Sequence, residues 1–446
     1  MKQARDGYKM TELGEIPVEW ELMELQDVMQ KGGSGVKRGP FGGALKKENF
    51  VADGFAVYEQ QHVIYNQFNN IRYFITSEKF DELSGFEVLP EDILISCSGT
   101  VGKVSIVPKR IKRGVMNQAL LRFRLEKNLA DHTFLYFLLI SEDVQSRMLD
   151  MTHGSTIKNM VAVSEIKGLK IGLPSLKEQQ KIAEILSTVD EQIENTEQLI
   201  EKTKALKKGL MQQLLTKGIG HTEFKQTELG EIPVEWDIKS FQELLDNKTI
   251  ISIQDGNHGE RHPRSSDYIS ENKGDAVPFI MASDLKNGSL DYNSCNFISL
   301  EQAKQLRVGH CFPNDILFSH KGSVGKVALV SDEYCYLMLT PQVTLYRIGE
   351  NSILHREYLK CFMQSDRYQE NIIKLSAQST RNYIGISEQK KQLITMPTLE
   401  EQQKIASILS SVDEQIKSYE QEKEKYLELK KGLMQQLLTG QIRVTV

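Results

Sequence analysis

The sequence predicts an α+β protein in which two globular domains are separated by a pair of long antiparallel coiled-coil helices, with an internal duplication that relates the two halves. Three repeated segments support this prediction. TELGEIPVEW occurs at 11–20 and again, unchanged, at 227–236, and 29 of 40 residues are identical between 178–217 and 401–440. Between them lie EDILISCSGTVGKVSIV at 91–107 and NDILFSHKGSVGKVALV at 314–330. The same order in both halves indicates a tandem duplication.

The repeats divide the chain into four predicted parts, which are a first globular domain at 1–174, a central helix at 175–218, a second globular domain at 219–397 and a C-terminal helix at 398–446. Between the repeated segments, residues 31–90 and 247–313 have almost nothing in common. Neutral drift of one half would give scattered differences instead of such blocks. We therefore expect one frame that presents two different binding surfaces.

Each globular domain is expected to contain a twisted, mostly antiparallel sheet with a few helices. The glycine segments at 99–103 and 322–326 are flanked by alternating apolar residues, which predicts a turn between two strands. Apolar runs at 134–140 and 358–363 predict one core helix in each domain.

The two long helices have clear start signals. Ser175 and Glu178, like Thr398 and Glu401, fit a capping box, in which the hydroxyl caps the helix and the glutamate reaches back to the cap. Pro174 precedes the first helix, and glycines at 218 and 440 are natural stops. Apolar residues then recur at heptad spacing, with a weak patch in the middle. The predicted seam contains Ile182, Leu186, Val189, Ile193, Leu210 and Leu214 in the first helix, and Ile405, Leu409, Val412, Ile416, Leu433 and Leu437 in the second.

Each helix of about 40 residues is roughly 60 Å long. Neither can bury its seam alone, so the two are expected to pack on each other, although ordinary core helices are an alternative. If the ends of the second globular domain lie close together, the second helix runs back along the first. A spacer of this length corresponds to about 18 base pairs of B-DNA, which suggests a two-part, gapped target.

Composition limits the possible classes of protein. The hydrophobic fraction is 40% and the charged fraction 26%, as in ordinary soluble proteins, and the N-terminal residues do not form the apolar segment of a signal peptide. The net charge of −5 argues against a protein that coats nucleic acid without specificity. Five cysteines with no CxxC pair suggest neither a disulfide framework nor a zinc site, so a reducing, cytoplasmic setting is expected.

The sequence offers little support for chemistry of its own. An amino-methyltransferase would need adjacent prolines in its base-binding loop, and none of the eleven prolines is adjacent to another. The glycine segments lack the spacing of a phosphate-binding loop, so they are interpreted as turns, with phosphate contacts by Lys103 and Lys326 as the alternative. The nuclease-like triplets at 165–167 and 388–390 are common by chance, and His258 and His262 lie in a glycine- and proline-containing loop unlike a metal-binding helix. We expect no catalytic residues and no bound metal.

Several segments together resemble the specificity subunits of Type I restriction–modification systems. They are IPVEW, which occurs twice, the DIL-x-S-x-x-G-[ST]-V-G-K segment of each domain, and the helix starts LPSLKEQQKIA and MPTLEEQQKIA. The similarity covers essentially the whole chain. It implies two target-recognition domains for a bipartite, asymmetric DNA site, and two methyltransferase and two motor–nuclease partner subunits. The complex would methylate adenine N6 or cleave unmethylated DNA, with S-adenosylmethionine, ATP and Mg²⁺ bound by the partners.

Direct base readout requires side chains with paired hydrogen-bonding groups, which are Arg and Lys for guanine and Asn and Gln for adenine. Such side chains are expected on loops that a rigid sheet supports. The candidates in the first domain are Lys37, Arg38, Gln60, Gln61, His62, Thr156, Lys158 and Asn159, and those in the second are Asn257, His258, Arg261, Arg264, Thr380, Arg381 and Asn382. The alternative for each one is a solvated loop side chain. Trp20 and Trp236 are interpreted as anchors between each domain and the helices.

Two other functional classes remain open at this point. A self-sufficient nuclease or methyltransferase would be active as a purified chain, and the motif search opposes it. A coiled-coil adaptor that binds only proteins would show no salt-sensitive DNA affinity, whereas neutralisation of phosphates gives a steep dependence on salt.

Overall fold

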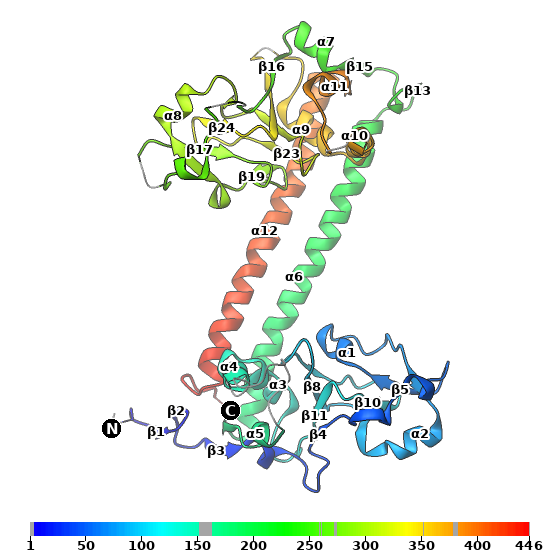
Figure 1. Cartoon of the computed structure of the whole chain (residues 1–446), viewed down its shortest axis with the longest axis vertical. Coiled ribbons are helices and arrows are strands. Elements are labelled where there is room, and N and C mark those ends of the chain that lie inside the picture. The colour runs from blue at the N-terminus through cyan, green and yellow to red at the C-terminus, as the bar shows by residue number, and fades with distance from the viewer. Residues whose placement is uncertain are drawn as a thin grey trace. The chain divides into compact units, whose positions relative to one another are not determined.

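The structure is a computed structural model that describes residues 4–150, 163–257, 259, 261–271, 274–350, 352–377 and 382–445. It divides into two compact units, one formed by Met1–Glu197 with Gln421–Val446 and the other by Gln198–Glu420. Each unit contains one globular domain and one half of each long helix (Figure 1). The boundary between the units therefore lies within the helices.

The first globular domain is built on two four-stranded sheets. One is antiparallel throughout and has the strand order β4-β11-β8-β9. The other has the order β6-β5-β10-β7, with β5 and β10 parallel. The strands are β4 (Val36–Arg38), β5 (Phe55–Tyr58), β6 (Phe74–Ile75), β7 (Glu87–Val88), β8 (Ile93–Ser96), β9 (Val104–Ile106), β10 (Gly114–Met116) and β11 (Leu120–Phe123).

The second globular domain repeats this plan. Its sheets have the orders β16-β25-β22-β23 and β20-β17-β24-β21, and β17 and β24 are the parallel pair. The strands are β16 (Ile250–Asp255), β17 (Ala276–Ile280), β20 (Asn296–Ser299), β21 (His310–Cys311), β22 (Ile316–Ser319), β23 (Val327–Leu329), β24 (Leu337–Leu339) and β25 (Val343–Ile348), with a small hairpin of β18 (Leu285–Lys286) and β19 (Ser289–Leu290). The predicted α+β class and its mostly antiparallel pairing are confirmed. Each domain nevertheless has two sheets where the sequence predicted one.

Short antiparallel pairs frame each domain next to its helix. In the first unit these are β1 (Tyr8–Thr11) with β2 (Gly14–Pro17), and β3 (Glu21–Glu24) with β12 (Lys170–Leu173). In the second unit they are β13 (Phe224–Thr227) with β14 (Gly230–Pro233), and β15 (Asp237–Ser240) with β26 (Leu393–Met396). Residues from both ends of a domain thus meet beside the start of its long helix.

The predicted core helices are confirmed as α3 (His132–Ile140) and α9 (Arg356–Gln364), which carry a buried apolar face in each domain. The other short helices are α1 (Gln60–Ile64), α2 (Ser77–Glu82), α4 (Glu142–Asp150), α5 (Val163–Lys167), α7 (Phe241–Asp246), α8 (Leu300–Gln305), α10 (Asp366–Ala377) and α11 (Ile386–Lys391). The long helices are α6 (Leu176–Lys217) and α12 (Leu399–Leu437).

The long helices run antiparallel within each unit. In the second unit Lys204 pairs with Glu420 at 3.1 Å and Lys207 with Asp413 at 2.5 Å. A later residue of α6 therefore meets an earlier residue of α12, so the two helices run in opposite directions. In the first unit the same pattern is given by two further ion pairs, Lys430 with Asp190 at 2.5 Å and Lys423 with Glu197 at 2.7 Å. These ion pairs include lysines of the weak patch that the heptad pattern predicted. The apolar ends of the predicted seam are buried, among them Ile182, Leu186, Ile405, Leu409 and Leu437.

The starts of the long helices differ in one respect from the predicted capping box. Ser175 Oγ accepts a hydrogen bond from the Glu178 amide at 3.3 Å, as expected. Glu178 does not reach back to the cap, because its carboxylate accepts a hydrogen bond from the indole nitrogen of Trp20 at 3.3 Å. In the second unit Glu401 accepts from Trp236 at 3.0 Å in the same way. The tryptophans are each 1% exposed, which confirms that they anchor the domains to the helices.

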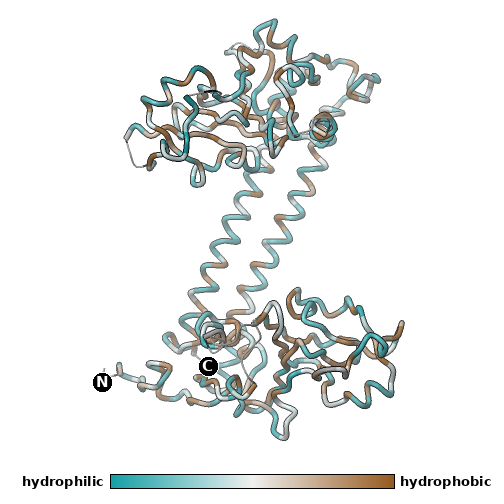
Figure 2. Tube along the Cα trace, viewed as in Figure 1, coloured by the Kyte–Doolittle hydropathy of each residue, from teal (hydrophilic) through white to brown (hydrophobic). Residues whose placement is uncertain are grey.

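Figure 2 shows that apolar residues gather along the strands of each domain, whereas the long helices are mostly hydrophilic with apolar residues at intervals. Among the residues that the structure describes, no helix has the length and apolar character needed to cross a bilayer.

Candidate nucleic-acid interface

The antiparallel sheet of the first domain presents several loops at one edge. Strand β4 ends at Arg38 and β8 ends at Ser96, while β9 begins at Val104 and β11 begins at Leu120. The register pairs Arg38 with Leu121 and Ser96 with Leu120, so these strand ends are adjacent. We call the surface formed by the loops 39–46, 97–103 and 117–119 the first sheet edge.

The first sheet edge brings together three of the predicted DNA-binding residues. The Arg38 guanidinium lies 5.3 Å from the centre of the exposed Phe41 ring, and its Nε donates to the Gln118 carbonyl at 3.4 Å. Gln60, at the start of α1, lies beside Gly99 of the turn between β8 and β9. Lys103 closes the same turn and is exposed. An arginine, an amide and a lysine from three separate segments therefore share one edge.

Other predicted residues of the first domain have different surroundings. Lys37 points away from this edge, with its Nζ 4.4 Å from the centre of the Phe86 ring. Gln61 donates to the Glu59 carboxylate at 3.1 Å. His62 is buried, with Nδ1 bonded to Glu59 and Nε2 3.0 Å from the Asn70 carbonyl oxygen. Both ring nitrogens are engaged, so this structure leaves His62 no group for contacting a base. Thr156, Lys158 and Asn159 lie outside the described residues.

The second domain has a matching edge. Strand β16 ends at Asp255 and β22 at Ser319, while β23 begins at Val327 and β25 at Val343. The register pairs Asp255 with Thr344 and Ser319 with Val343. We call the loops at 320–326 and 340–342, with the described residues that follow Asp255, the second sheet edge.

Two predicted residues, Lys326 and Asn382, lie at or next to the turn of the second sheet edge. Lys326 closes the turn between β22 and β23, and the segment with Asn382 is joined to that turn because Lys321 bridges Tyr383. Arg261 and Arg264 are exposed in the loop after β16. Asn257 is buried, and no described residue hydrogen-bonds its amide nitrogen. His258, Thr380 and Arg381 lie outside the described residues.

The glycine turns are held by the same clamp in both domains, which confirms the predicted turns. Ser96 Oγ accepts from the Lys103 amide at 3.0 Å, and Ser319 Oγ accepts from the Lys326 amide at 2.9 Å. A glutamine from the following helix donates to the turn carbonyl at 3.1 Å from Gln145 and at 2.8 Å from Gln369. Gly102 and Gly325 have φ values of 85° and 100°, which favour glycine. The backbone that carries the two lysines is therefore rigidly held.

Sequence reasoning missed a polar network beneath the second sheet edge. The Thr344 hydroxyl donates to Asp255 at 2.7 Å and lies 2.8 Å from Nδ1 of the buried His320, while Gln389 donates to the same hydroxyl at 3.1 Å. Repeat alignment could have marked His320, because the first domain has Cys97 at that position. Burial raises the pKa of Cys97 to about 12, so it remains a neutral thiol. The supports of the two edges are chemically different.

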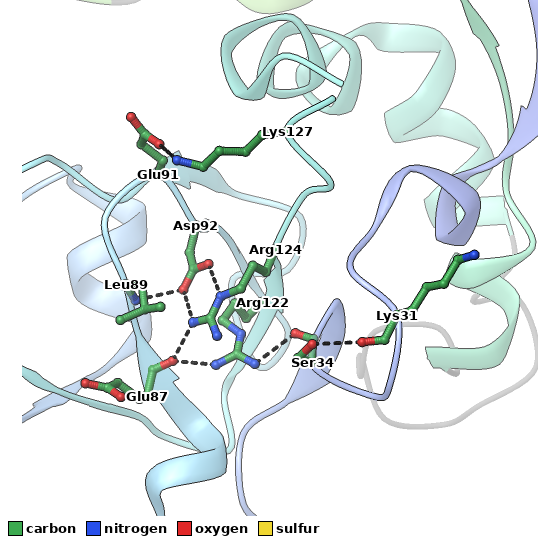
Figure 3. A network of polar contacts seen from close by, with 9 residues as sticks. All are labelled: Lys31, Ser34, Glu87, Leu89, Glu91, Asp92, Arg122, Arg124 and Lys127. Carbon is green, nitrogen blue, oxygen red and sulfur yellow. Dashed lines mark hydrogen bonds and ion pairs between the residues drawn. The ribbon is translucent and has the colours of Figure 1, made fainter. Parts of the chain in front are cut away.

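A second network holds the loop that enters β4 (Figure 3). The buried Arg122 guanidinium donates to the Ser34 carbonyl at 3.0 Å and to the Glu87 carbonyl, while Arg124 pairs with both oxygens of Asp92 at 2.8 Å. Burial lowers the pKa of Arg122 to about 10. The network fixes the beginning of the strand that ends at Arg38.

Comparison with known proteins identifies the family. The sequence model of the family described as "Type I restriction modification DNA specificity domain" matches residues 17–205 and 233–429. The chain belongs to this family. The two matches correspond to the two halves of the duplication, so the DNA specificity domain is present twice.

Relatives and solved structures agree with this assignment. The chain is 28% identical over 444 residues to the putative type I restriction enzyme MjaX specificity subunit of Methanocaldococcus jannaschii, covering 98% of this chain and 97% of the relative. It is 23% identical over 334 residues to the EcoBI specificity subunit of Escherichia coli, covering 72% and 66%. A structure titled "Crystal structure of Type-I restriction-modification system S subunit from M. genitalium" shares the fold, with a TM-score of 0.55, 18% identity and 96% and 97% coverage. A structure of a type I restriction–modification system has a TM-score of 0.58, 16% identity and 96% and 99% coverage.

As a type I specificity subunit, the chain supplies the DNA specificity of a restriction–modification system. Its two divergent segments each supply one loop of a sheet edge, whereas the repeated segments form the glycine turns and the helix starts. The duplicated frame and the variable edges therefore correspond to the general and the specific parts of that role.

Proposed function

We propose that this specificity subunit selects an asymmetric, two-part DNA site in which each sheet edge contacts one half-site, and that it catalyses no reaction itself. The observation that supports the proposal is the occurrence of one framework edge twice with different side chains. Arg38 pairs with Leu121 in the first sheet, and Asp255 pairs with Thr344 at the equivalent place in the second. The same position in the two sheets thus carries a positive side chain in the first domain and a negative one in the second. Two different edges on separate domains select two different half-sites with a gap between them.

The side chains at the two edges suit different parts of DNA. Arg38 offers the paired donors that match guanine, and Gln60 offers the amide that matches adenine. Lys103 and Lys326, on their clamped turns, suit phosphate contacts that position the duplex. Arg264 and Asn382 take the base-contacting role at the second edge, together with Arg381 beyond the described residues.

The partners in this proposal are two methyltransferase subunits and two motor–nuclease subunits. Two equivalent halves of one chain provide two equivalent surfaces, which fits two copies of each partner. Adenine N6 methylation and DNA cleavage are assigned to those partners, which bind S-adenosylmethionine, ATP and Mg²⁺. We place the complex in the cytoplasm, where its DNA substrate is found.

The experiment first maps methylated adenines in DNA from cells that carry the subunit with its methyltransferase, which identifies both half-sites. Affinity of the purified complex for that site is then measured at two salt concentrations. Arg38→Ala and Arg264→Ala should each cost about 1–3 kcal/mol of binding and relax specificity in one half-site only. Lys103→Ala and Lys326→Ala should weaken binding to all sequences and reduce the salt slope by about 1.

Lys127→Ala is a matched control. Lys127 is an exposed lysine near the opposite edge of the same sheet, where it pairs with Glu91 at 2.7 Å. It should leave DNA affinity and the salt slope unchanged. If all five variants behave alike, the sheet edges are not the DNA interface. If the complex shows no salt-sensitive affinity for any DNA, the chain is a protein-binding adaptor.

A further inference from the structure

An exposed phenylalanine lies in a glycine-rich loop of the first sheet edge. Phe41 is 70% exposed and follows Arg38 by three residues, in the segment RGPFGG at 38–43. Single exposed apolar residues are common on protein surfaces, so the exposure alone does not indicate a function. The way in which the loop is built and the groups that surround the ring do indicate one.

The backbone that leads to Phe41 is tightly fixed. The Gly39 amide donates to the Leu120 carbonyl at 2.9 Å, and a Cβ atom added at Gly39 would overlap the carbonyl oxygen of Asn117. Pro40 is buried, and Phe41 follows it with an extended backbone at a φ of −85°. Only glycine allows the chain to leave the sheet so close to the next loop. The loop therefore buries one side chain and exposes the next.

The second domain has the same exit from its sheet. The Gly256 amide donates to the Val343 carbonyl at 3.0 Å, and a Cβ atom there would again overlap a backbone carbonyl. Asn257, at the place of the proline, is buried. Counted from the equivalent positions 38 and 255, the next residue in the sequence is His258, which lies outside the described residues. One backbone device thus precedes different rings, as expected where side chains determine specificity.

The surroundings of Phe41 favour DNA as the molecule that covers it. None of the three loops that define the first sheet edge contains an aspartate or a glutamate. The Arg38 guanidinium lies 5.3 Å from the centre of the Phe41 ring, and Lys103 is exposed at the same edge. An edge with cations and without carboxylates suits a polyanion. An apolar ring among those cations is placed to contact bases instead of phosphates.

The chemistry of the ring selects one part of a base pair. A phenyl ring has no hydrogen-bonding group, and the apolar group that distinguishes one base from the others in the major groove is the 5-methyl group of thymine. Successive base pairs are about 3.4 Å apart along the duplex. A ring centre 5.3 Å from the Arg38 guanidinium therefore reaches a base pair close to the one that Arg38 contacts.

We propose that Phe41 packs against the 5-methyl group of a thymine in the first half-site, close to the base that Arg38 contacts, and that it gives this half-site its preference for thymine at that position. The inference rests on the proposed function, because it requires the first sheet edge to face the major groove. A phenylalanine can also act as a wedge between unstacked bases. The experiment separates these two modes of contact.

The test uses the complex of the specificity subunit with its methyltransferase and duplexes that contain the mapped site. Each thymine of the first half-site is replaced in turn by deoxyuridine, which lacks only the methyl group. In the wild type, one replacement should weaken binding about fourfold, the effect of leaving one methyl group uncovered. In Phe41→Ala the thymine duplex should bind at least about fourfold more weakly, and the same replacement should change affinity less than about twofold. Phe41→Leu should retain a preference for thymine.

Tyr65→Ala is the matched control. Tyr65 is also 70% exposed and belongs to the same domain, but its neighbour Asn66 lines a cavity with Pro108, beyond the end of β9 that is farther from the first sheet edge. This variant should retain the wild-type response to deoxyuridine. Deoxyuridine in the second half-site should affect the wild type and Phe41→Ala equally.

The same response of the wild type and Phe41→Ala to deoxyuridine at every thymine of the first half-site would overturn the inference. A loss of affinity in Phe41→Ala that is equal for thymine and deoxyuridine duplexes would identify a wedge instead. A loss of bound methyltransferase from this variant would show that a protein covers the ring, and this too would overturn the inference. If Arg38→Ala leaves the specificity for the first half-site unchanged, the proposed function itself is wrong, whatever the response to deoxyuridine.

Discussion

A buried aspartate paired with a partly exposed arginine occurs at the same place in both globular domains and provides a matched test of their energetics. In the second domain Arg347 donates to both oxygens of Asp315 at 2.8 and 2.6 Å, and hydrogen bonding to Asp315 raises the pKa of Arg347. Asp315 is only 3% exposed. In the first domain Arg124 pairs with Asp92 in the same way. The local difference is Arg122, whose counterpart in the second domain is the buried Leu345.

Arg347→Met retains the apolar stem but removes the charge. It leaves the Asp315 carboxylate buried without its cation, although the Phe312 amide still donates to it at 2.9 Å and Cys311 still lies beside it. Breaking a buried ion pair on one side costs about 3–5 kcal/mol. Arg124→Met should cost less, about 1–3 kcal/mol, because the positive charge of Arg122 still acts on Asp92 and its repulsion by Arg124 is relieved. Adding Asp315→Asn to Arg347→Met should recover part of the loss.

Native-state hydrogen exchange can measure both changes in one protein, because it reports the opening free energy of each segment. Global melting is less suitable, since a chain with two compact units need not unfold in one step. Peptides from β22 and β25 report on the Arg347 variant, and peptides from β8 and β11 on the Arg124 variant. Equal losses of opening free energy in the two domains would show that the charge of Arg122 does not compensate for the removal of Arg124. A larger loss in the first domain would refute the electrostatic explanation.

Three further predictions concern other parts of the chain. Trp236→Phe removes the donor to Glu401 and should lower the stability of the second unit by about 1–2 kcal/mol in the same exchange measurement, whereas exchange in the first unit should not change. At pH 8 a thiol reagent should modify the exposed Cys335 rapidly, whereas Cys97 and Cys361 should react only after denaturation because burial raises their pKa values to about 12 and 11; Cys335→Ser should remove the rapid phase. Burial lowers the pKa of His355, so the unfolded chain binds a proton first as pH falls below 6.5 and stability decreases there; His355→Asn should reduce this decrease when hydrogen exchange of α9 peptides is compared at pH 5 and 7.

Much of the framework could be predicted because its signals are local or repeated. The capping hydroxyls, the prolines before the helices and the heptad spacing predicted α6 and α12 with starts within a residue or two of those observed. The glycine turns followed from apolar alternation on either side. The duplication supplied a second copy of each signal. Two helices with matching apolar seams were then expected to pack on each other, and close termini of the second domain implied that they run antiparallel.

The remaining features depend on contacts between residues far apart in sequence. The role of Glu178 is one example, because the capping pattern involves residues three positions apart whereas Trp20 lies 158 positions away. The burial of His62 and Asn257 is another, since both belong to polar loop sequences that suggested exposure. The division into two sheets was missed because short strands such as β6 and β7 have only two residues each and give no periodic signal.

The equivalence of Arg38 and Asp255 has a consequence for changing DNA specificity. Asp255 accepts from Thr344, which also contacts His320, and all three positions differ in the first domain, where Arg38, Leu121 and Cys97 stand. An aspartate placed at position 38 alone would have an apolar leucine and a neutral thiol beside it instead of a hydroxyl and an imidazole. An unsatisfied carboxylate next to a buried layer is unfavourable, so the single exchange should destabilise the edge without transferring its preference. Transfer of specificity between the two domains therefore requires the buried layer to be exchanged together with the exposed side chains.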